Sequence, residues 1–239
     1  MLFLAGCATV PSSQKNLAPL YQNENSTLDQ ESFAALWERR TVLFGQATAG
    51  RGPGLLGTGF SALGGPKAGG AGFPMNVAAT LIDSLLLESG FQHYSVMLHM
   101  SPQEEEEFRQ AYRRRYDPAN HILIWCDLRT TWAELHLNLD RWTVFIEVRD
   151  DELRQYEPVE MLEESQAARP AVMDMLPGIG PGPGPARRQV HQKTVMFCFP
   201  RQDLLKNPVL SPKVKSLRLV FQETNDQRTK AEGIWVFRE

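Results

Sequence analysis

The spacing of hydrophobic residues changes from a helical period to a strand period near residue 117. Two segments before that point, Leu28–Phe44 and Met75–Glu88, repeat apolar residues at the i, i+3, i+4 intervals of an amphipathic helix. The first segment carries Phe33, Leu36, Trp37, Val42, Leu43 and Phe44, and the second carries Val77, Ala78, Leu81, Ile82, Leu85 and Leu86. We expect Trp37 to be a core anchor and Gly90 to end the second helix.

The segment Ser101–Glu104 is the clearest local signal in the chain. Serine at the cap, Pro102 at the first helical position and Glu104 at the third form a capping box. Acidic residues then fill the first turns and Arg113–Arg115 the last, in the order that complements the helix dipole. We expect a helix with a solvated, charged face. The preceding residues 91–100 alternate Tyr94, Val96 and Leu98 with other residues, which favours a strand.

After residue 117 the pattern is that of β-strands. His121–Leu128 is a mostly apolar run, and Trp142–Val148 and Leu153–Val159 form a hairpin around the turn at residues 149–152. Further strands are expected at 190–199, 216–223 and 233–238. Sequential strands with short turns favour antiparallel sheets. The sequence therefore predicts an α+β fold in which an N-terminal helical part, residues 28–116, packs on a C-terminal antiparallel β-sandwich of immunoglobulin-like architecture, residues 117–239.

Low-complexity segments interrupt both parts. Residues 8–27 are polar and are expected to be a flexible tether. Residues 45–74 are rich in Gly and Ala, and residues 169–188 contain alternating Pro and Gly, so we expect long loops at both places. Such loops are either contact surfaces for a partner or excursions tolerated because closure of a long loop costs little entropy.

Composition excludes several classes of protein. A net charge of −3 and a pI near 6.0 leave no basic field of the kind that nucleic-acid binding requires. No apolar run approaches the roughly 18 residues of a membrane-spanning helix. At 239 residues with 42% hydrophobic residues, the chain can bury one sizeable core or two smaller ones.

The first residues suggest where the protein works. Leu4-Ala5-Gly6-Cys7, followed by a polar run with Pro11, resembles a bacterial lipobox. The resemblance implies export, removal of residues 1–6 and acylation of Cys7, with sorting to the outer membrane facing the periplasm. Only a short apolar stretch precedes this motif, without Lys or Arg, so we expect the start codon to lie upstream. Two or three acyl chains would hold the body firmly on its bilayer.

The remaining cysteines, Cys126 and Cys198, lie in strand-like runs. An oxidising compartment would allow a disulfide between them. The alternative is a pair of free thiols buried as small hydrophobic groups. The alternation of neighbouring apolar residues places the two cysteines out of phase, which favours the alternative.

Motifs for catalysis or cofactor binding do not hold up in context. Gly52–Gly57 matches G-x-G-x-x-G, but proline and glycine surround it where a strand and a helix are needed. Gly59–Leu63 lacks the last glycine of a nucleophile elbow. The acidic run Asp150–Glu152 is better explained as a hairpin turn than as a calcium site. The histidines lack metal-ligand spacing; they are His93, His99, His121, His136 and His191. We therefore predict no catalytic, cofactor, metal or small-molecule site.

The favoured function is non-enzymatic. We expect a lipid-anchored binding or assembly subunit that presents sheet edges and loops to a protein partner of the envelope. The alternative is a lipid-anchored hydrolase acting on cell-wall or glycan material, which would need a cleft lined by perturbed carboxylates. A third interpretation is a structural filler of the periplasmic leaflet.

Overall fold

The computed structural model of this chain describes residues 13–16, 33–45, 73–130, 134–164 and 191–237. Cys7, most of the expected tether, residues 46–72 of the Gly-rich segment and the Pro/Gly segment 169–188 lie outside the described residues. Predictions about lipidation and about these loops therefore stay predictions.

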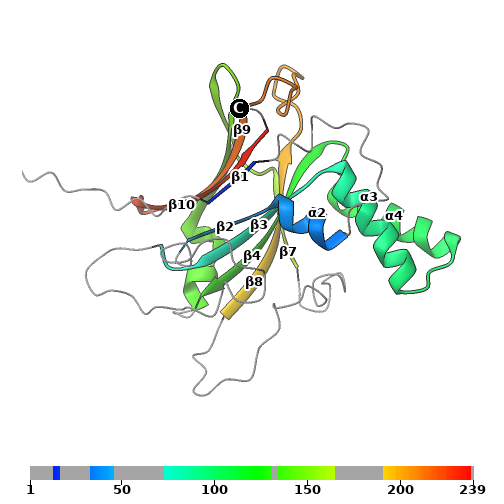
Figure 1. The fold of residues 1–239 in the computed structure, drawn as a ribbon. Helices are drawn as coiled ribbons and strands as arrows, with labels where there is room; N and C mark the ends of the chain where they lie inside the picture. The colour runs from blue at the N-terminus through cyan, green and yellow to red at the C-terminus, as the bar shows by residue number, and fades with distance from the viewer. Residues whose placement is uncertain (1–12, 17–32, 46–72, 131–133, 165–190, 238–239) are drawn as a thin grey trace, which may run out of the picture.

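The described strands form two five-stranded sheets. Sheet A has the order β1-β10-β9-β5-β6 and sheet B the order β2-β3-β4-β8-β7 (Figure 1). Neighbouring described strands pair antiparallel, except β1, which runs parallel to β10. The strands are β1 (Ser13–Asn16), β2 (Thr41–Gly45), β3 (Asn76–Ile82), β4 (His121–Thr130), β5 (Trp142–Arg149), β6 (Leu153–Tyr156), β7 (Glu160–Glu164), β8 (His191–Pro200), β9 (Ser216–Glu223) and β10 (Asp226–Val236).

The larger hydrophobic core lies between the two sheets. Alternate residues of each strand point into it because successive side chains of a strand face opposite sides. Sheet B contributes Val42, Phe44, Val77, Ala79, Leu81, Ile122, Ile124, Cys126, Leu128, Val195, Phe197 and Phe199, and sheet A contributes Trp142, Val144, Ile146, Val148, Leu217, Leu219, Phe221, Ala231 and Trp235. Gly233 lies between the last two of these, and a Cβ there would lie 2.5 Å from the side chain of Val42. Glycine therefore lets β10 approach β2 closely.

A helical layer covers the other face of sheet B (Figure 1). It consists of α2 (Phe33–Arg40), α3 (Ser84–Met97) and α4 (Pro102–Tyr116); the 3₁₀ helices η3 (Glu134–Leu137) and η4 (Leu139–Arg141) precede β5. A second core forms between these helices and the sheet, from Phe33, Leu36, Trp37, Leu86, Tyr94, Tyr116, Leu123, Trp125, Met196 and Cys198. Strands β4 and β8 are therefore buried on both faces, which explains the nearly continuous apolar run of β4.

The α+β class and the largely antiparallel sheets are confirmed. Strands β4, β8, β9 and the β5–β6 hairpin lie at the predicted places, and β10 begins at Asp226 rather than at Gly233 as predicted. The helix that begins at Pro102 has the predicted capping box, because the side chain of Ser101 accepts from the backbone of Glu104 and the carboxylate of Glu104 accepts from the backbone of Ser101.

Both predicted helices before residue 100 were partly wrong. The segment Leu28–Phe44 becomes a strand at Thr41, and Met75–Glu88 begins with β3 and turns helical only at Ser84. In β3 the residues spaced by four along a supposed helix, Val77 and Leu81, are also in phase along a strand with Ala79 between them, so the spacing did not distinguish the two. The expected helical part thus supplies two strands to sheet B.

The strand expected over residues 91–100 is also wrong, because α3 continues through Gly90 to Met97. A Cβ at Gly90 would lie 3.3 Å from the ring of Phe33, so glycine serves here for close packing of α2 on α3 rather than as a helix end. The alternation was misleading because Val96 and Leu98 are exposed at the C-terminal end of α3 and do not mark the buried face of a strand.

Part of the expected tether is a strand as well. Residues Ser13–Asn16 pair with Gly233–Val236 of β10. Pairing at a sheet edge uses backbone groups and needs no apolar periodicity, so the polar sequence gave no signal for it.

A buried ion pair joins the helical layer to both sheets. Nε of Arg40 donates to the carboxylate of Asp83 at 2.7 Å, and the arginine is 1% exposed. The same carboxylate caps α3 by accepting from the backbone of Leu86. The indole of Trp235, in β10, donates to the carbonyl of Arg40 at 2.7 Å. One residue at the α2–β2 junction thus contacts α3 and sheet A.

We predict that Asp83→Asn lowers the free energy of unfolding by roughly 3 kcal/mol, because it leaves a buried guanidinium without a counter-charge. Asparagine is a good helix cap, so the change tests the charge rather than the cap. Urea denaturation measures the effect. Asp140→Asn, at an exposed position, is the control and should change stability by less than about 0.5 kcal/mol. Equal stability of the two variants would contradict the assigned role.

Candidate functional site

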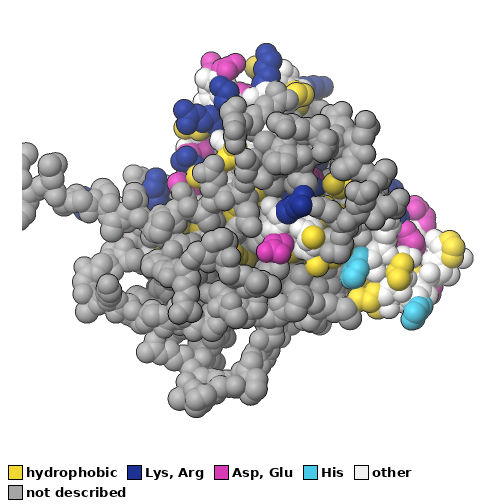
Figure 2. All heavy atoms as spheres, in the orientation of Figure 1, with side chains coloured by type: hydrophobic (Ala, Val, Ile, Leu, Met, Phe, Trp, Pro, Cys, Tyr) yellow, Lys and Arg dark blue, Asp and Glu magenta, His cyan; other side chains and the backbone are white. Residues whose placement is uncertain are grey.

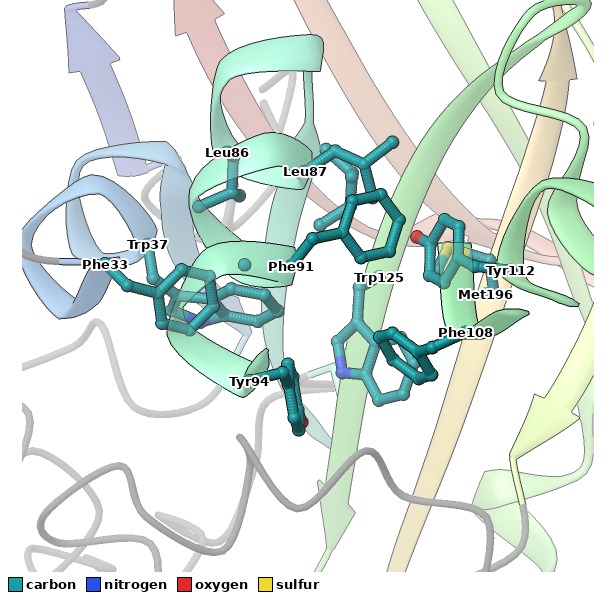
Figure 3. A pocket seen from close by; sticks show the side chains of 12 residues that line it. Phe33, Trp37, Leu86, Leu87, Phe91, Tyr94, Phe108, Tyr112, Trp125 and Met196 are labelled. Carbon is teal, nitrogen blue, oxygen red and sulfur yellow. The ribbon is translucent and has the colours of Figure 1, made fainter. Parts of the chain in front are cut away.

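An aromatic pocket lies where the helical layer meets sheet B (Figure 3). All three described helices and three strands of the sheet contribute to it. It is lined by Phe33, Trp37, Ile82, Leu86, Leu87, Gly90, Phe91, Tyr94, Phe108, Tyr112, Trp125 and Met196. We call it the helix–sheet pocket.

Helical spacing and strand pairing determine which wall of the pocket each of these side chains belongs to. Phe33 and Trp37 in α2, and Phe108 and Tyr112 in α4, are spaced i, i+4 and so share a helix face. Trp125 is the direct cross-strand partner of Met196 in the β4–β8 pair. The floor of the helix–sheet pocket is therefore a strand pair, and its walls are helices.

Ring contacts hold the α3–α4 wall in shape. The ring of Phe91 meets those of Phe108 and Tyr112 edge to face, with centroids 5.7 and 5.5 Å apart. Such pairs contribute about 0.5–1.5 kcal/mol beyond the area they bury. The guanidinium of Arg109 lies 4.8 Å from the centroid of the Phe91 ring, on which it stacks.

Charged groups outside the pocket fasten its walls. Arg109 in α4 binds both carboxylate oxygens of Glu88 in α3, at 2.6 and 2.7 Å, and this hydrogen bonding lowers the pKa of Glu88. At the other end of α4, Arg115 and the hydroxyl of Tyr116 bind the buried carboxylate of Glu164 in β7. Helix α4 is thus held on one side by α3 and on the other by sheet B.

The free space in the pocket is small, about 70 Å³. One water needs roughly 10–15 Å³ by this measure, whereas pockets for drug-sized ligands measure about 300–1,000 Å³. The space fits a group of a few heavy atoms, such as a branched aliphatic side chain. No charged side chain is among the described residues that line it.

One polar group in this lining has no partner. The indole N–H of Trp125 is buried, on a residue that is 3% exposed, and has no hydrogen-bond acceptor in the described structure. Figure 3 shows its nitrogen on the edge of the ring that faces Tyr94. A buried donor without an acceptor costs about 1–3 kcal/mol, so an occupant with an acceptor at this point would recover that energy.

The sequence left open whether Cys126 and Cys198 form a disulfide, and the structure keeps them apart. Both are free and buried; Cys126 faces the core between the sheets, and Cys198 faces the helices. Their strands are neighbours, but the side chains point to opposite faces of sheet B, which no disulfide can span. Burial raises the pKa of both thiols, that of Cys198 to about 11.

The remaining sequence candidates are dispersed. Asp150–Glu152 forms the turn between β5 and β6, as predicted, and Asp150 pairs with Arg154. Among the residues that the structure describes, no group of three or more His, Cys, Asp and Glu side chains could hold a metal ion. The glycine motifs at 52–57 and 59–63 lie outside the described residues.

Sequence reasoning missed the helix–sheet pocket. It identified Trp37 as a buried anchor, which is confirmed, but treated Phe91 and Tyr94 as strand residues. The sequence does predict that Phe108 and Tyr112 share the buried face of α4, but it does not show what this face packs against. Trp125 could not be found this way, since only the fold brings it under the helices.

Comparison of the chain with models of known protein families, with curated proteins and with solved structures finds no match. Within the described ranges, no helix has the length and apolar character needed to cross a membrane.

We predict that Trp125→Phe destabilises the protein less than Trp235→Phe does. Both indoles are almost fully buried, so both changes remove similar volume, but only Trp235 loses a hydrogen bond and leaves a buried carbonyl unpaired. The difference in unfolding free energy, measured by denaturant titration, should be about 1–2 kcal/mol. An equal or larger loss for Trp125→Phe would show that its N–H has a partner after all.

We also predict that Cys126 and Cys198 resist alkylation in the folded protein and react once it is unfolded, without any reductant. Their burial and raised pKa keep them protonated and inaccessible at neutral pH. Mass spectrometry after iodoacetamide treatment, in buffer and in denaturant, measures the labelling. A need for reductant in denaturant would reveal a disulfide and contradict the arrangement.

Proposed function

We propose that the protein is an envelope lipoprotein, anchored through Cys7, that binds a protein partner and catalyses no reaction. The observation that carries the proposal is the unpaired indole N–H of Trp125 in an uncharged aromatic pocket. We further propose that the pocket receives one aliphatic side chain of the partner. In this proposal the two antiparallel sheets form an immunoglobulin-like sandwich, which serves as the rigid support for the helical layer.

The size and polarity of the pocket support a peptide as occupant. Its free space suits a leucine-sized side chain and is too small for a cofactor. In a peptide, a backbone carbonyl lies only a few bonds from the side chain, so one residue can fill the space and accept from Trp125. The absence of a charged residue from the described lining favours a neutral acceptor over a carboxylate.

A fatty acyl chain fits less well. Its tail would fill the apolar space but has no acceptor near its end, so the indole N–H would stay unpaired. Its carboxylate would need a cation to compensate burial. The alternative function, a hydrolase, needs a cleft lined by carboxylates; the described lining of the helix–sheet pocket contains none.

Titration with N-acetyl-L-leucinamide tests the binding function. Heteronuclear NMR follows the indole N–H signals, and that of Trp125 is assigned by its loss in Trp125→Phe. We expect this signal to move downfield as the N–H gains an acceptor, with a dissociation constant on the order of millimolar for so small a probe. Trp142 and Trp235 already donate to carbonyls and should not move.

N-acetylglycinamide is the matched control ligand, because it offers the same carbonyls without the side chain. It should leave the Trp125 signal unchanged. Trp125→Phe should weaken binding of the leucine probe by roughly two- to tenfold while keeping the apolar space. No shift with the leucine probe would overturn the proposal, and hexanoate binding without a Trp125 shift would indicate an acyl ligand instead.

The anchor is tested separately. Growth with a labelled fatty acid should mark the parent protein, expressed with its complete signal, and should leave Cys7→Ala unmarked. The variant should also leave the membrane fraction. A labelled Cys7→Ala protein would contradict the anchor and leave the pocket experiment unaffected.

A further inference from the structure

The connection between β8 and β9 presents two leucines to solvent. Leu204 is fully exposed and Leu205 is 82% exposed, whereas Val209, a few residues on, is completely buried. In Figure 1 this connection stands at the top of the molecule, beside the end marked C. Adjacent leucines exposed to this degree keep most of their contact with water on folding, so packing within the described part of the chain does not explain them.

Hydrogen bonds hold the tip of this loop in one shape. The carboxylate of Asp203 accepts from the backbone N–H groups of Leu205 and Asn207, both at 2.8 Å. The backbone of Asp203 also donates to Asn207, and Lys206 takes a left-handed conformation with φ 64° to close the turn. The base is pinned by Val209, which donates to the carbonyl of Arg201 at 2.9 Å. These hydrogen bonds fix the conformation of the turn and keep both leucines exposed.

The charges around the tip are mostly positive. Arg201 and Lys206 flank the leucines, and within the described structure neither has a carboxylate within ion-pair distance. Asp203 lies on the tip itself, and the backbone N–H groups that bind its carboxylate lower its pKa and keep it negatively charged. In the β5–β6 turn, Asp150 pairs with Arg154 and Asp151 with Lys215. Figure 2 shows Lys and Arg side chains together with hydrophobic and acidic ones at this end of the molecule. The tip thus combines two apolar side chains with two cations, Arg201 and Lys206, that form no ion pair within the described residues, and with one carboxylate, Asp203; Arg201 also donates to the carbonyl of His121.

We propose that the β8–β9 tip is a membrane contact, in which Leu204 and Leu205 enter the interface of an anionic bilayer while Arg201 and Lys206 meet lipid phosphates. A protein partner would need a pocket that matches the protruding leucines. A bilayer accepts a protruding tip without matching its shape, and anionic headgroups attract the two cations beside the leucines. This contact goes beyond the proposed function, since it needs neither acylation of Cys7 nor the helix–sheet pocket.

Vesicle flotation of the full chain carrying Cys7→Ala tests the proposal, because no acyl chain can then contribute. The protein should float with vesicles of phosphatidylcholine and phosphatidylglycerol and bind phosphatidylcholine alone at least roughly tenfold more weakly. Replacing both leucines, Leu204→Ser with Leu205→Ser, should weaken binding to the mixed vesicles by roughly tenfold or more. Arg201→Gln with Lys206→Gln should weaken it as well, and added salt should remove the difference between the vesicles.

The matched control is Val96→Ser with Leu98→Ser, which removes another pair of exposed aliphatic side chains, 76% and 49% exposed, from the outer end of the helical layer. Its binding should equal that of the parent. A parent that does not float, a leucine variant that floats as well as the parent, or equal loss in the control would each overturn the proposal.

Insertion has its own readout. Because Cys126 and Cys198 are buried, adding Leu204→Cys to the Cys7→Ala protein provides a thiol that an environment-sensitive dye can label selectively in the folded state. The dye should shift to the blue with anionic vesicles if the tip enters the interface. An unchanged spectrum on bound protein would show that another surface makes the contact.

Discussion

The ion pair between Arg40 and Asp83 is the constraint on which the arrangement of layers depends. It lies where helix α2 changes into strand β2, and its carboxylate begins α3. A buried charge pair gives little net stability but is costly to break, so it selects one arrangement against its alternatives. Here it fixes where α2 ends and where α3 starts, and the carbonyl of Arg40 adds a bond to sheet A through Trp235.

The helix–sheet pocket follows from that arrangement. Helices α2 and α3 are set on sheet B by the ion pair and by the close contact of Gly90 with Phe33, and α4 is fastened to them by Arg109. The large aromatic side chains of three helices then meet over Trp125 without filling all the space above it. A pocket with an unpaired donor is a local departure from good packing, and departures of this kind in native proteins have strain, function or an ordered water as their cause.

The sequence predicted best where local chemistry decides structure. The capping box at Ser101 uses neighbouring residues only, and the strands after residue 117 alternate because one or both faces meet a core. Predictions failed where a tertiary contact decides between two local possibilities. Val77 and Leu81 fit a helix or a strand, and only pairing of β3 with β2 and β4 selects the strand. The pocket could not be predicted, because it forms through such tertiary contacts between residues distant in sequence, such as Phe33 and Trp125.

The edge strand β1 has a mechanical consequence. Ser13–Asn16 runs parallel to the last strand, so tension applied through the residues before Ser13 acts along the strand axis. Under that geometry the backbone bonds between β1 and β10 are loaded together in shear rather than opened one after another. Force applied to the amino end would thus pass first into β10, the strand that β1 pairs with in sheet A.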